Sequence, residues 1–196
     1  MEELILMLKR IHPLSPELEA YLRTIIKPRI YRAGEHLLQV GEISKDILFL
    51  KKGLVMSYYP RRKKEVANWF MKEGDICISI LSFFRQQPSV DSIVAYEYCE
   101  CWGITHPELQ ATYQFYPEFN RHAQQITSEY YCRSEERHQA ILRQTAEEKY
   151  ARLVQNDPDL IRRVKNKHLA SFLNVADRTY YASQKKYANR KRKKKR

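Results

Sequence analysis

Residues 167–188 read KHLASFLNVADRTYYASQKKYA, and this stretch decides the fold of the C-terminal part of the chain. A helix-turn-helix needs a small residue on its first helix, a sharp turn, and a second helix with one apolar face. Ala170 is the small residue, and Asn174 stands where the chain must take a positive φ, which asparagine tolerates well. The predicted core positions are Leu169, Leu173, Val175 and Tyr180.

The outward face of the second helix carries side-chain types that bond to base edges and phosphates. The predicted DNA-contacting residues are Lys167, Asp177, Arg178, Thr179, Tyr181, Gln184 and Lys185. Arg178 is the expected base contact, whereas the alternative for Gln184 and Lys185 is a purely solvated role. Ser183 departs from the pattern, because such a helix normally buries an aliphatic residue at that position.

The net charge of +12 is concentrated at the C-terminus. Residues 185–196 contain nine Lys or Arg and no acid, so the other 184 residues carry only +3. Such a run is often a solvated end, but here it directly follows a candidate DNA-reading helix. We therefore expect the basic tail over 189–196 to add affinity for nucleic acid without sequence preference.

The N-terminal two thirds of the chain predict a β-rich domain flanked by helices. Apolar residues recur at helical spacing over 2–11, and Ser15-Pro16 is a helix start, so two short helices come first. From about Ile25 to Ile104, short β-rich runs alternate with glycines at 34, 41, 53 and 74. This pattern predicts an antiparallel, jelly-roll-like β-roll within an α+β fold.

A long helix is predicted from Phe119 onward. Alternating steps of four and three residues link Phe119, Ala123, Ile126, Tyr130, Arg133, Arg137 and Ala140. These positions favour a coiled-coil seam between two subunits, and the alternative is a helix lying on its own β-roll. Thr145 and Glu148 have capping-box spacing, so a further helix begins at 146, and Pro158 ends it near 156.

Nearly the whole chain resembles the Crp/Fnr family of bacterial transcription regulators. The resemblance rests on AGEHLLQVGE (33–42), ILFLKKGLVMSYY (47–59), MKEGDI (71–76) and TAEEKYARLVQNDPDLIRRVKNKHLASFLNVADRTYY (145–181), of which the last is the most specific. It implies a cyclic-nucleotide-binding-like effector domain (1–115), a dimerisation helix and hinge (116–144), a winged helix-turn-helix (145–188) and the basic tail. It also implies a homodimer on palindromic double-stranded DNA, with RNA polymerase as a further candidate partner.

The ligand site departs from the family's cAMP-binding members. Where those members carry Gly-Glu and Arg-Ser pairs for the ribose and the cyclic phosphate, this chain has Ile78-Ser79 and Ser89-Val90. Without the cation, cAMP binding in the usual geometry is not expected, and the effector stays unknown. Arg85 is expected to be a solvated charge. The candidate pocket residues are Ser79, Ser89, Thr127 and Ser128.

The cofactor, if any, stays unknown, and no iron–sulfur cluster is expected. The resemblance implies that an iron–sulfur cluster, as in oxygen-sensing relatives, would be bound by N-terminal cysteines, and no cysteine precedes Cys77. The spacing of Cys77, Cys99, Cys101 and Cys132 is not that of a zinc site. A haem ligand could only be guessed among His36, His122 and His138. No apolar run reaches the ~20 residues of a membrane-spanning helix, and the acidic N-terminus is unlike a secretory signal, so we expect a cytoplasmic protein without membrane contact.

Two alternatives to an effector-controlled regulator remain open. One is a dimer that has lost sensing and binds DNA or protein constitutively. The other is a β-roll metal enzyme, which would need a His-x-His pair that the sequence lacks. A non-enzymatic protein is the expectation.

Overall fold

The computed structural model describes residues 1–61 and 64–194 of the chain. It begins with the two predicted helices, α1 (Glu2–Ile11) and α2 (Pro16–Ile25). The Ser15 hydroxyl accepts a hydrogen bond from the Leu18 N–H at 3.2 Å and so caps α2, whose first residue is Pro16. The helix start predicted at Ser15-Pro16 is therefore confirmed.

Eight strands then form two four-stranded antiparallel sheets with the orders β1-β8-β3-β6 and β2-β7-β4-β5. The strands are β1 (Lys27–Tyr31), β2 (His36–Leu38), β3 (Asp46–Lys52), β4 (Val55–Arg61), β5 (Lys64–Met71), β6 (Ile76–Cys77), β7 (Ser92–Ala95) and β8 (Cys99–Thr105). A short helix, α3 (Ile80–Arg85), separates β6 from β7. The predicted β-roll is confirmed, and the glycines predicted at its turns all have positive φ.

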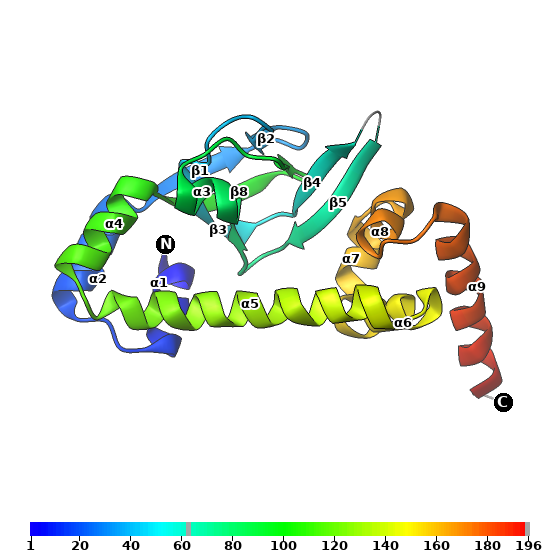
Figure 1. Cartoon of the computed structure of the whole chain (residues 1–196). Helices are drawn as coiled ribbons and strands as arrows, with labels where there is room; N and C mark the ends of the chain where they lie inside the picture. The colour runs from blue at the N-terminus through cyan, green and yellow to red at the C-terminus, as the bar shows by residue number, and fades with distance from the viewer. Residues whose placement is uncertain (62–63, 195–196) are drawn as a thin grey trace.

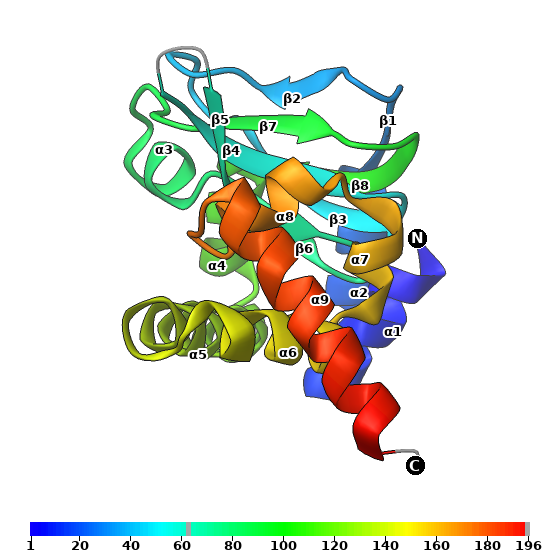
Figure 2. The same ribbon diagram turned by 90° about the vertical axis from the view of Figure 1, so that its right-hand side faces the viewer.

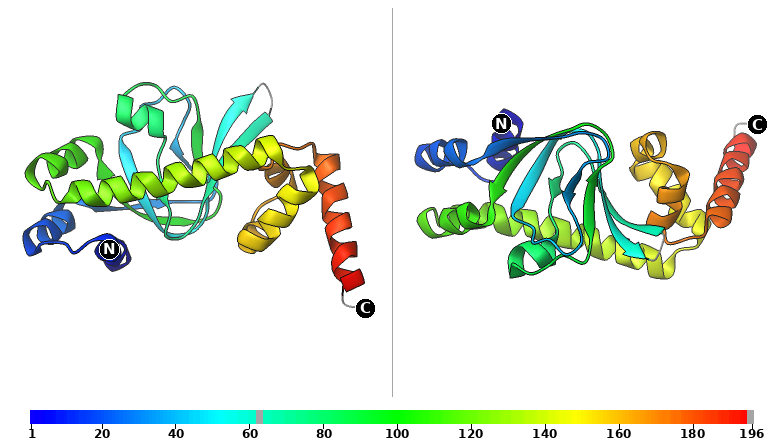
Figure 3. Two further views of the ribbon diagram at one scale, coloured as in Figure 1. Left: turned by 60° about the horizontal axis from the view of Figure 1, so that its bottom comes forward. Right: turned by 90° about the horizontal axis from the view of Figure 1, so that it is seen from above.

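Two helices follow the roll. A capping box of Thr105 and Glu108 starts α4 (His106–Phe115), and α5 (Phe119–Arg143) then runs the length of the molecule. Figure 1 shows α5 passing beneath the roll, with the N-terminal helices at one end and the C-terminal helices at the other. Figure 3 shows the same arrangement from two further directions.

The seam predicted on α5 faces the chain's own β-roll. Phe119 is buried in the core formed with α1 and α2. The Tyr130 hydroxyl accepts from the Ile76 N–H at 2.6 Å, and Arg133 pairs with Asp75 at 2.9 Å. A heptad stripe shows that one helix face is covered but not what covers it. The polar half of the stripe therefore has its partners within the same chain, as the alternative of a helix on its own β-roll predicts, whereas a subunit contact along α5 stays a prediction.

Four helices complete the fold: α6 (Ala146–Asn156), α7 (Pro158–Arg163), α8 (Asn166–Phe172) and α9 (Asp177–Lys194). The predicted capping box of Thr145 and Glu148 starts α6, with both reciprocal hydrogen bonds present. Among the residues that the structure describes, no strand follows β8. The predicted wing is therefore missing there, because the Lys- and Arg-rich sequence after Tyr187 favours helix and lacks β-branched alternation.

The predicted tail does not begin at a structural break. Residues 189–194 continue α9 without interruption, and residues 195–196 lie outside the described part of the chain.

One hydrophobic core joins the roll to the C-terminal helices. Apolar residues of β4 and β5, such as Met56 and Phe70, pack in one cluster with Leu153, Leu160 and Leu169. In Figure 2, which faces the C-terminal end, α9 lies in front of α6 and α8. The C-terminal helices are thus docked on the roll, with α9 outermost.

Candidate nucleic-acid interface and β-roll pocket

The pair α8 and α9 has the predicted helix-turn-helix geometry. Leu169, Ala170 and Tyr180 are fully buried, while Leu173 and Val175 are partly buried against the same core. Asn174 has φ +53°, the left-handed conformation predicted for the turn. The turn fixes the direction of α9, so one face of α9 is buried and the opposite face points outward.

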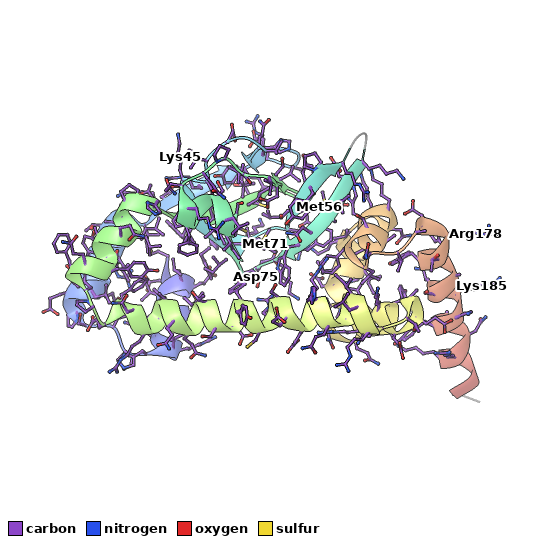
Figure 4. The ribbon with its side chains drawn as sticks, in the orientation of Figure 1. Lys45, Met56, Met71, Asp75, Arg178 and Lys185 are labelled. Atoms are coloured by element: carbon purple, nitrogen blue, oxygen red, sulfur yellow. The ribbon has the colours of Figure 1, made fainter. Side chains whose placement is uncertain are left out.

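The outward face of α9 carries most of the predicted DNA-contacting residues. Arg178, Thr179, Tyr181 and Lys185 are exposed, as is Asp177 at the helix start, whereas Gln184 is half-buried. Figure 4 shows Arg178 and Lys185 projecting from α9 away from the roll. Lys167 is exposed on α8. Within residues 1–61 and 64–194, neither Arg178 nor Lys185 has a carboxylate partner, so both cations face solvent.

The other side of α9 is held by α6. The Tyr180 and Tyr187 rings both stack edge-on against Tyr150, with ring centroids 5.4 and 5.6 Å away. Lys186 and Arg190 both pair with Glu147, at 2.5 and 2.9 Å. Of four cations on α9, Arg178 and Lys185 belong to a free outer row, whereas Lys186 and Arg190 form an inner row that fixes the helix.

Ser183 occupies the buried position at which the sequence pattern expects an aliphatic residue. Its hydroxyl donates to the Thr179 carbonyl at 3.0 Å, within its own helix. The polar group is thus satisfied locally and does not need a partner in the core.

Helix α8 covers the edge of the second sheet. The order β2-β7-β4-β5 makes β5 an edge strand, and its Ala67 N–H donates to the Ser171 hydroxyl of α8 at 3.0 Å. Arg163 of α7 adds a network of ion pairs to Glu73, Glu97 and Asp159, at 2.7–2.9 Å. These contacts protect an otherwise unpaired edge and attach the helix pair to the roll.

A cavity of about 480 Å³ lies between the roll and α5. Ser79 and Ser89 line it, and their hydroxyls are 3.1 Å apart, so the structure brings these two predicted pocket residues together. Both hydroxyls also donate to Oδ1 of buried Asp91, at 2.6 and 2.7 Å, and Ser57 donates to Oδ2 at 2.8 Å. The pocket wall therefore holds a buried carboxylate two residues after Ser89, the position at which the sequence resemblance located the missing cation.

Asp91 is a residue that the sequence reasoning missed. Its only signal was an acid two residues after Ser89, just ahead of the apolar run that forms β7. Burying a carboxylate is costly unless hydrogen bonds satisfy it, and the three serine hydroxyls provide these bonds. Arg85 is exposed at the end of α3 and does not line the cavity.

The structure does not bring Thr127 and Ser128 to this cavity. Both are exposed on α5, and Thr127 lines a separate apolar groove. The α5 residues that line the serine-bearing cavity lie further along the helix: Tyr130, Ser134, Arg137, His138 and Ile141. The repeat of the Thr-Ser pair is therefore out of register with this pocket.

The cysteines and histidines do not gather into one site. In the described part of the chain, no group of three or more His, Cys, Asp or Glu side chains has metal-binding geometry. Cys77, Cys99 and Cys101 are buried free thiols, and burial raises the pKa of Cys77. His36 bonds to the Tyr58 hydroxyl and His122 to the His12 carbonyl, while His138 is exposed at the cavity.

Comparisons with known proteins agree with this geometry. Residues 28–115 match the family model of the cyclic nucleotide-binding domain. Across most of the chain, the fold matches FixK2 from Bradyrhizobium japonicum, with a TM-score of 0.71, 14% identity, and 85% of this chain and 86% of that chain covered.

Two further solved structures share the fold. CLP from Xanthomonas campestris, described as a c-di-GMP-responsive global regulator, gives a TM-score of 0.69 at 13% identity over 89% of this chain and 92% of its own. The catabolite activator protein of Thermus thermophilus gives 0.55 at 16% identity over 92% and 86%. No curated protein matches the chain in sequence.

The β-rich part of the chain thus resembles the cyclic nucleotide-binding domain over residues 28–115. The chain as a whole has the fold of the Crp/Fnr regulators, and the resemblance seen in its sequence is confirmed. No helix among the described residues is both long and apolar enough to cross a bilayer.

Proposed function

We propose that the chain is a DNA-binding transcription regulator of the Crp/Fnr type that acts as a homodimer on a palindromic operator. The observation that carries this proposal is the outer row of α9, where Arg178, Thr179, Tyr181 and Lys185 are exposed on one face of a helix-turn-helix. A recognition helix reads base edges in the major groove with such side chains. Lys167 on α8 is suited to a phosphate contact.

A second copy of the chain is the proposed partner of the outer face of α5. Positions 128, 131, 135, 138 and 142 are all exposed and follow alternating steps of three and four residues. Tyr131 and Leu142 are 67% and 69% exposed, respectively, which is unusual for large apolar side chains. Ile80, Leu81 and Phe84 of α3 are also exposed and would extend the contact. Two such faces related by a two-fold axis would place two α9 helices one helical turn of DNA apart.

For the effector, we propose that cAMP is not bound in the usual geometry. Asp91 would face the cyclic phosphate with a like charge, and its serine hydrogen bonds would have to be broken. These residues equally support the alternative of a regulator that has lost cyclic-nucleotide sensing. Cytoplasmic localisation, a non-enzymatic role and contact with RNA polymerase stay predictions.

DNA binding is tested by selecting duplexes from a random pool and then titrating the selected palindrome at several salt concentrations. Arg178→Ala should weaken binding to the selected site by about 5- to 150-fold, with little effect on random DNA. Lys186→Ala is the matched control, since it removes a cation from the same helix but from the side that pairs with Glu147. Deleting residues 189–196 should flatten the salt dependence for all sequences equally. Equal losses for Arg178→Ala and Lys186→Ala on every duplex would refute base reading by α9.

A further inference from the structure

A second cavity, of about 210 Å³, lies at the junction of the roll and the C-terminal helices. Its walls come from three parts of the chain: β5 with Trp69 and Phe70, α5, and the helices α6 to α8 with Leu153 and Phe172. Figure 4 labels Asp75, which lies on its rim between the roll and α5. Any ligand held there would touch both halves of the molecule at once.

The charges on the wall of this cavity do not balance. Five cations and three carboxylates line it. Each carboxylate is already paired with one of the cations, in the pairs Lys72–Asp157, Arg133–Asp75 and Arg152–Glu136. Two cations are left over, Lys149 of α6 and Arg137 of α5, so the wall carries an excess of two positive charges.

Lys149 is the more unusual of the two. Its side chain is only 8% exposed, and within residues 1–61 and 64–194 no carboxylate or hydrogen-bond acceptor pairs with its ammonium group. The residue is buried, but its ammonium group is not among the fully buried unpartnered atoms of the described residues, so it stays accessible from the cavity. A cation without a partner on a cavity wall is a ready binding group for an anion. Two other residues of α6 form salt bridges: Arg152 pairs with Glu136, and Glu147 pairs with Lys186.

Arg137 is also only partly satisfied. One guanidinium N–H donates to the Phe172 carbonyl of α8 at 2.9 Å, and the group stacks over Phe172 and Trp69, 4.5 and 5.9 Å from their ring centroids. Its Nε is buried without a partner in the described chain, as is Oε1 of Gln144 on the same wall. Burial lowers the pKa of Arg137 to about 10, as expected for a cation without a counter-charge.

We propose that this junction cavity binds a small, hydroxyl-bearing phosphate ester, with Lys149 and Arg137 neutralising the phosphate and Gln144 accepting from a ligand hydroxyl. A phosphate monoester is close to a dianion at neutral pH, which matches the two unpaired cations. The planar guanidinium donors of arginine suit phosphate oxygens. The cavity is smaller than the 300–1,000 Å³ typical of drug-sized ligands, so a sugar phosphate fits better than a dinucleotide.

The site would also couple the ligand to the helix-turn-helix, and this step rests on the proposed function. Arg137 donates to the carbonyl of Phe172, the last residue of α8. A bound phosphate would compete with the Phe172 carbonyl for the guanidinium N–H groups of Arg137. Ligand binding and the docking of α8 on the roll would therefore be coupled. DNA affinity should then change when the ligand is present.

The binding step is tested on the full chain without DNA, by isothermal titration with ribose 5-phosphate at constant ionic strength. Ribose and sulfate serve as probes for the sugar and the charge alone, and malate as a hydroxylated dicarboxylate. Ribose 5-phosphate should bind, and Lys149→Met and Arg137→Met should each weaken binding about tenfold or more. Lys186→Met is the matched control, because it removes a paired cation that lies outside this cavity, and should change affinity by less than about twofold.

Several results would overturn the assignment. One is the absence of binding to the wild-type chain, and another is tighter binding of malate than of ribose 5-phosphate. Loss of binding in Arg137→Met but not in Lys149→Met would place the phosphate in the serine-bearing cavity, which Arg137 also lines and Lys149 does not. Circular dichroism spectra of each variant, together with Lys149→Arg, which should retain binding, separate lost binding from lost folding. Because this titration contains no DNA, its outcome is independent of whether α9 reads a base sequence.

Discussion

Gly53 shows how strictly a single position can be constrained. It forms the turn between β3 and β4 with φ +102°, and an added Cβ would lie 2.3 Å from the Tyr98 carbonyl and 2.8 Å from Cys99 Sγ. Both atoms belong to the neighbouring segment that leads into β8, so neither can move without disturbing the first sheet.

Gly53→Ala should therefore destabilise the chain by about 2 kcal/mol or more, through backbone strain and a direct clash. Gly41→Ala is the matched control, because Gly41 has φ +90° but nothing within 4 Å of the added Cβ, and should cost only about 1 kcal/mol. Urea unfolding measures both. Equal losses for the two variants would show that conformation alone, and not the close approach to Tyr98, constrains Gly53.

At the residue scale, sequence reasoning succeeded where a position has one physical solution. Asn174 was assigned a positive φ because few other residues tolerate it, and Ser183 was recognised as a polar residue at a buried position. Asp91 was missed because a lone acid in a sequence is usually exposed. Its burial depends on three serines, and two of them, Ser57 and Ser79, reach Asp91 only in the folded roll.

The buried hydroxyl of Ser183 makes α9 less stable than an apolar residue would. Ser183→Ala should raise the free energy of unfolding by about 0.5 kcal/mol, because alanine is the better helix former and the lost hydrogen bond goes only to the helix's own backbone. The reciprocal change Ala182→Ser, on the exposed side, should lower it by a similar amount. Denaturant unfolding followed by circular dichroism reports both, and a loss of stability in Ser183→Ala would mean that the hydroxyl supports packing in the core.

At the element scale, periodicity and caps predicted where most helices lie. These patterns did not predict which part of the molecule packs against each helix face. The starts at Ser15-Pro16 and Thr145 were predicted because caps are local interactions. The α5 stripe was assigned to a partner subunit because the heptad pattern looks the same whether a second helix or a β-roll covers it. Arg133 and Arg137 were the clue, since each needed a polar partner that a two-fold related arginine could not provide.

The docking of the two halves should depend on pH through His168. This residue is buried between α8 and the roll, with its Nδ1 3.0 Å from the Tyr96 hydroxyl and its Nε2 3.3 Å from Glu65. Burial, together with nearby Lys167 and Lys165, lowers the pKa of His168 despite the opposing effect of Glu65. As the pH falls through about 6.5, the unfolded chain takes up a proton that the folded chain resists, so stability is lost toward acid.

The wild-type urea midpoint should therefore fall between pH 7.5 and pH 5.5, and His168→Asn should show a smaller fall. The quantity to compare is the change of the urea midpoint with pH in each protein, because the contribution of the other titratable groups is common to both. An identical pH dependence in the variant would exclude His168 as the source.

For the whole molecule, the order of the parts was predictable and their mutual packing was not. The β-roll, long helix and helix pair follow one another as local patterns indicate. The shared core joins β4 and β5 to the C-terminal helices, and the Arg163 network joins residues 90 positions apart. Such contacts leave no local signal in one sequence, and for the same reason the charge excess at the junction cavity was invisible before the fold was known.

Because of the carboxylate in the β-roll pocket, cyclic-nucleotide binding would require two substitutions, one that adds a cation and one that removes Asp91. Ser89→Arg alone would restore the family's missing cation but place it beside Asp91, where the two side chains would neutralise each other. Titration of that variant with cAMP should show no binding, and measurable binding would mean that the acid yields its place to a phosphate. Removal of the acid has to come first, and that intermediate loses the acceptor of three buried hydroxyls before it gains any ligand.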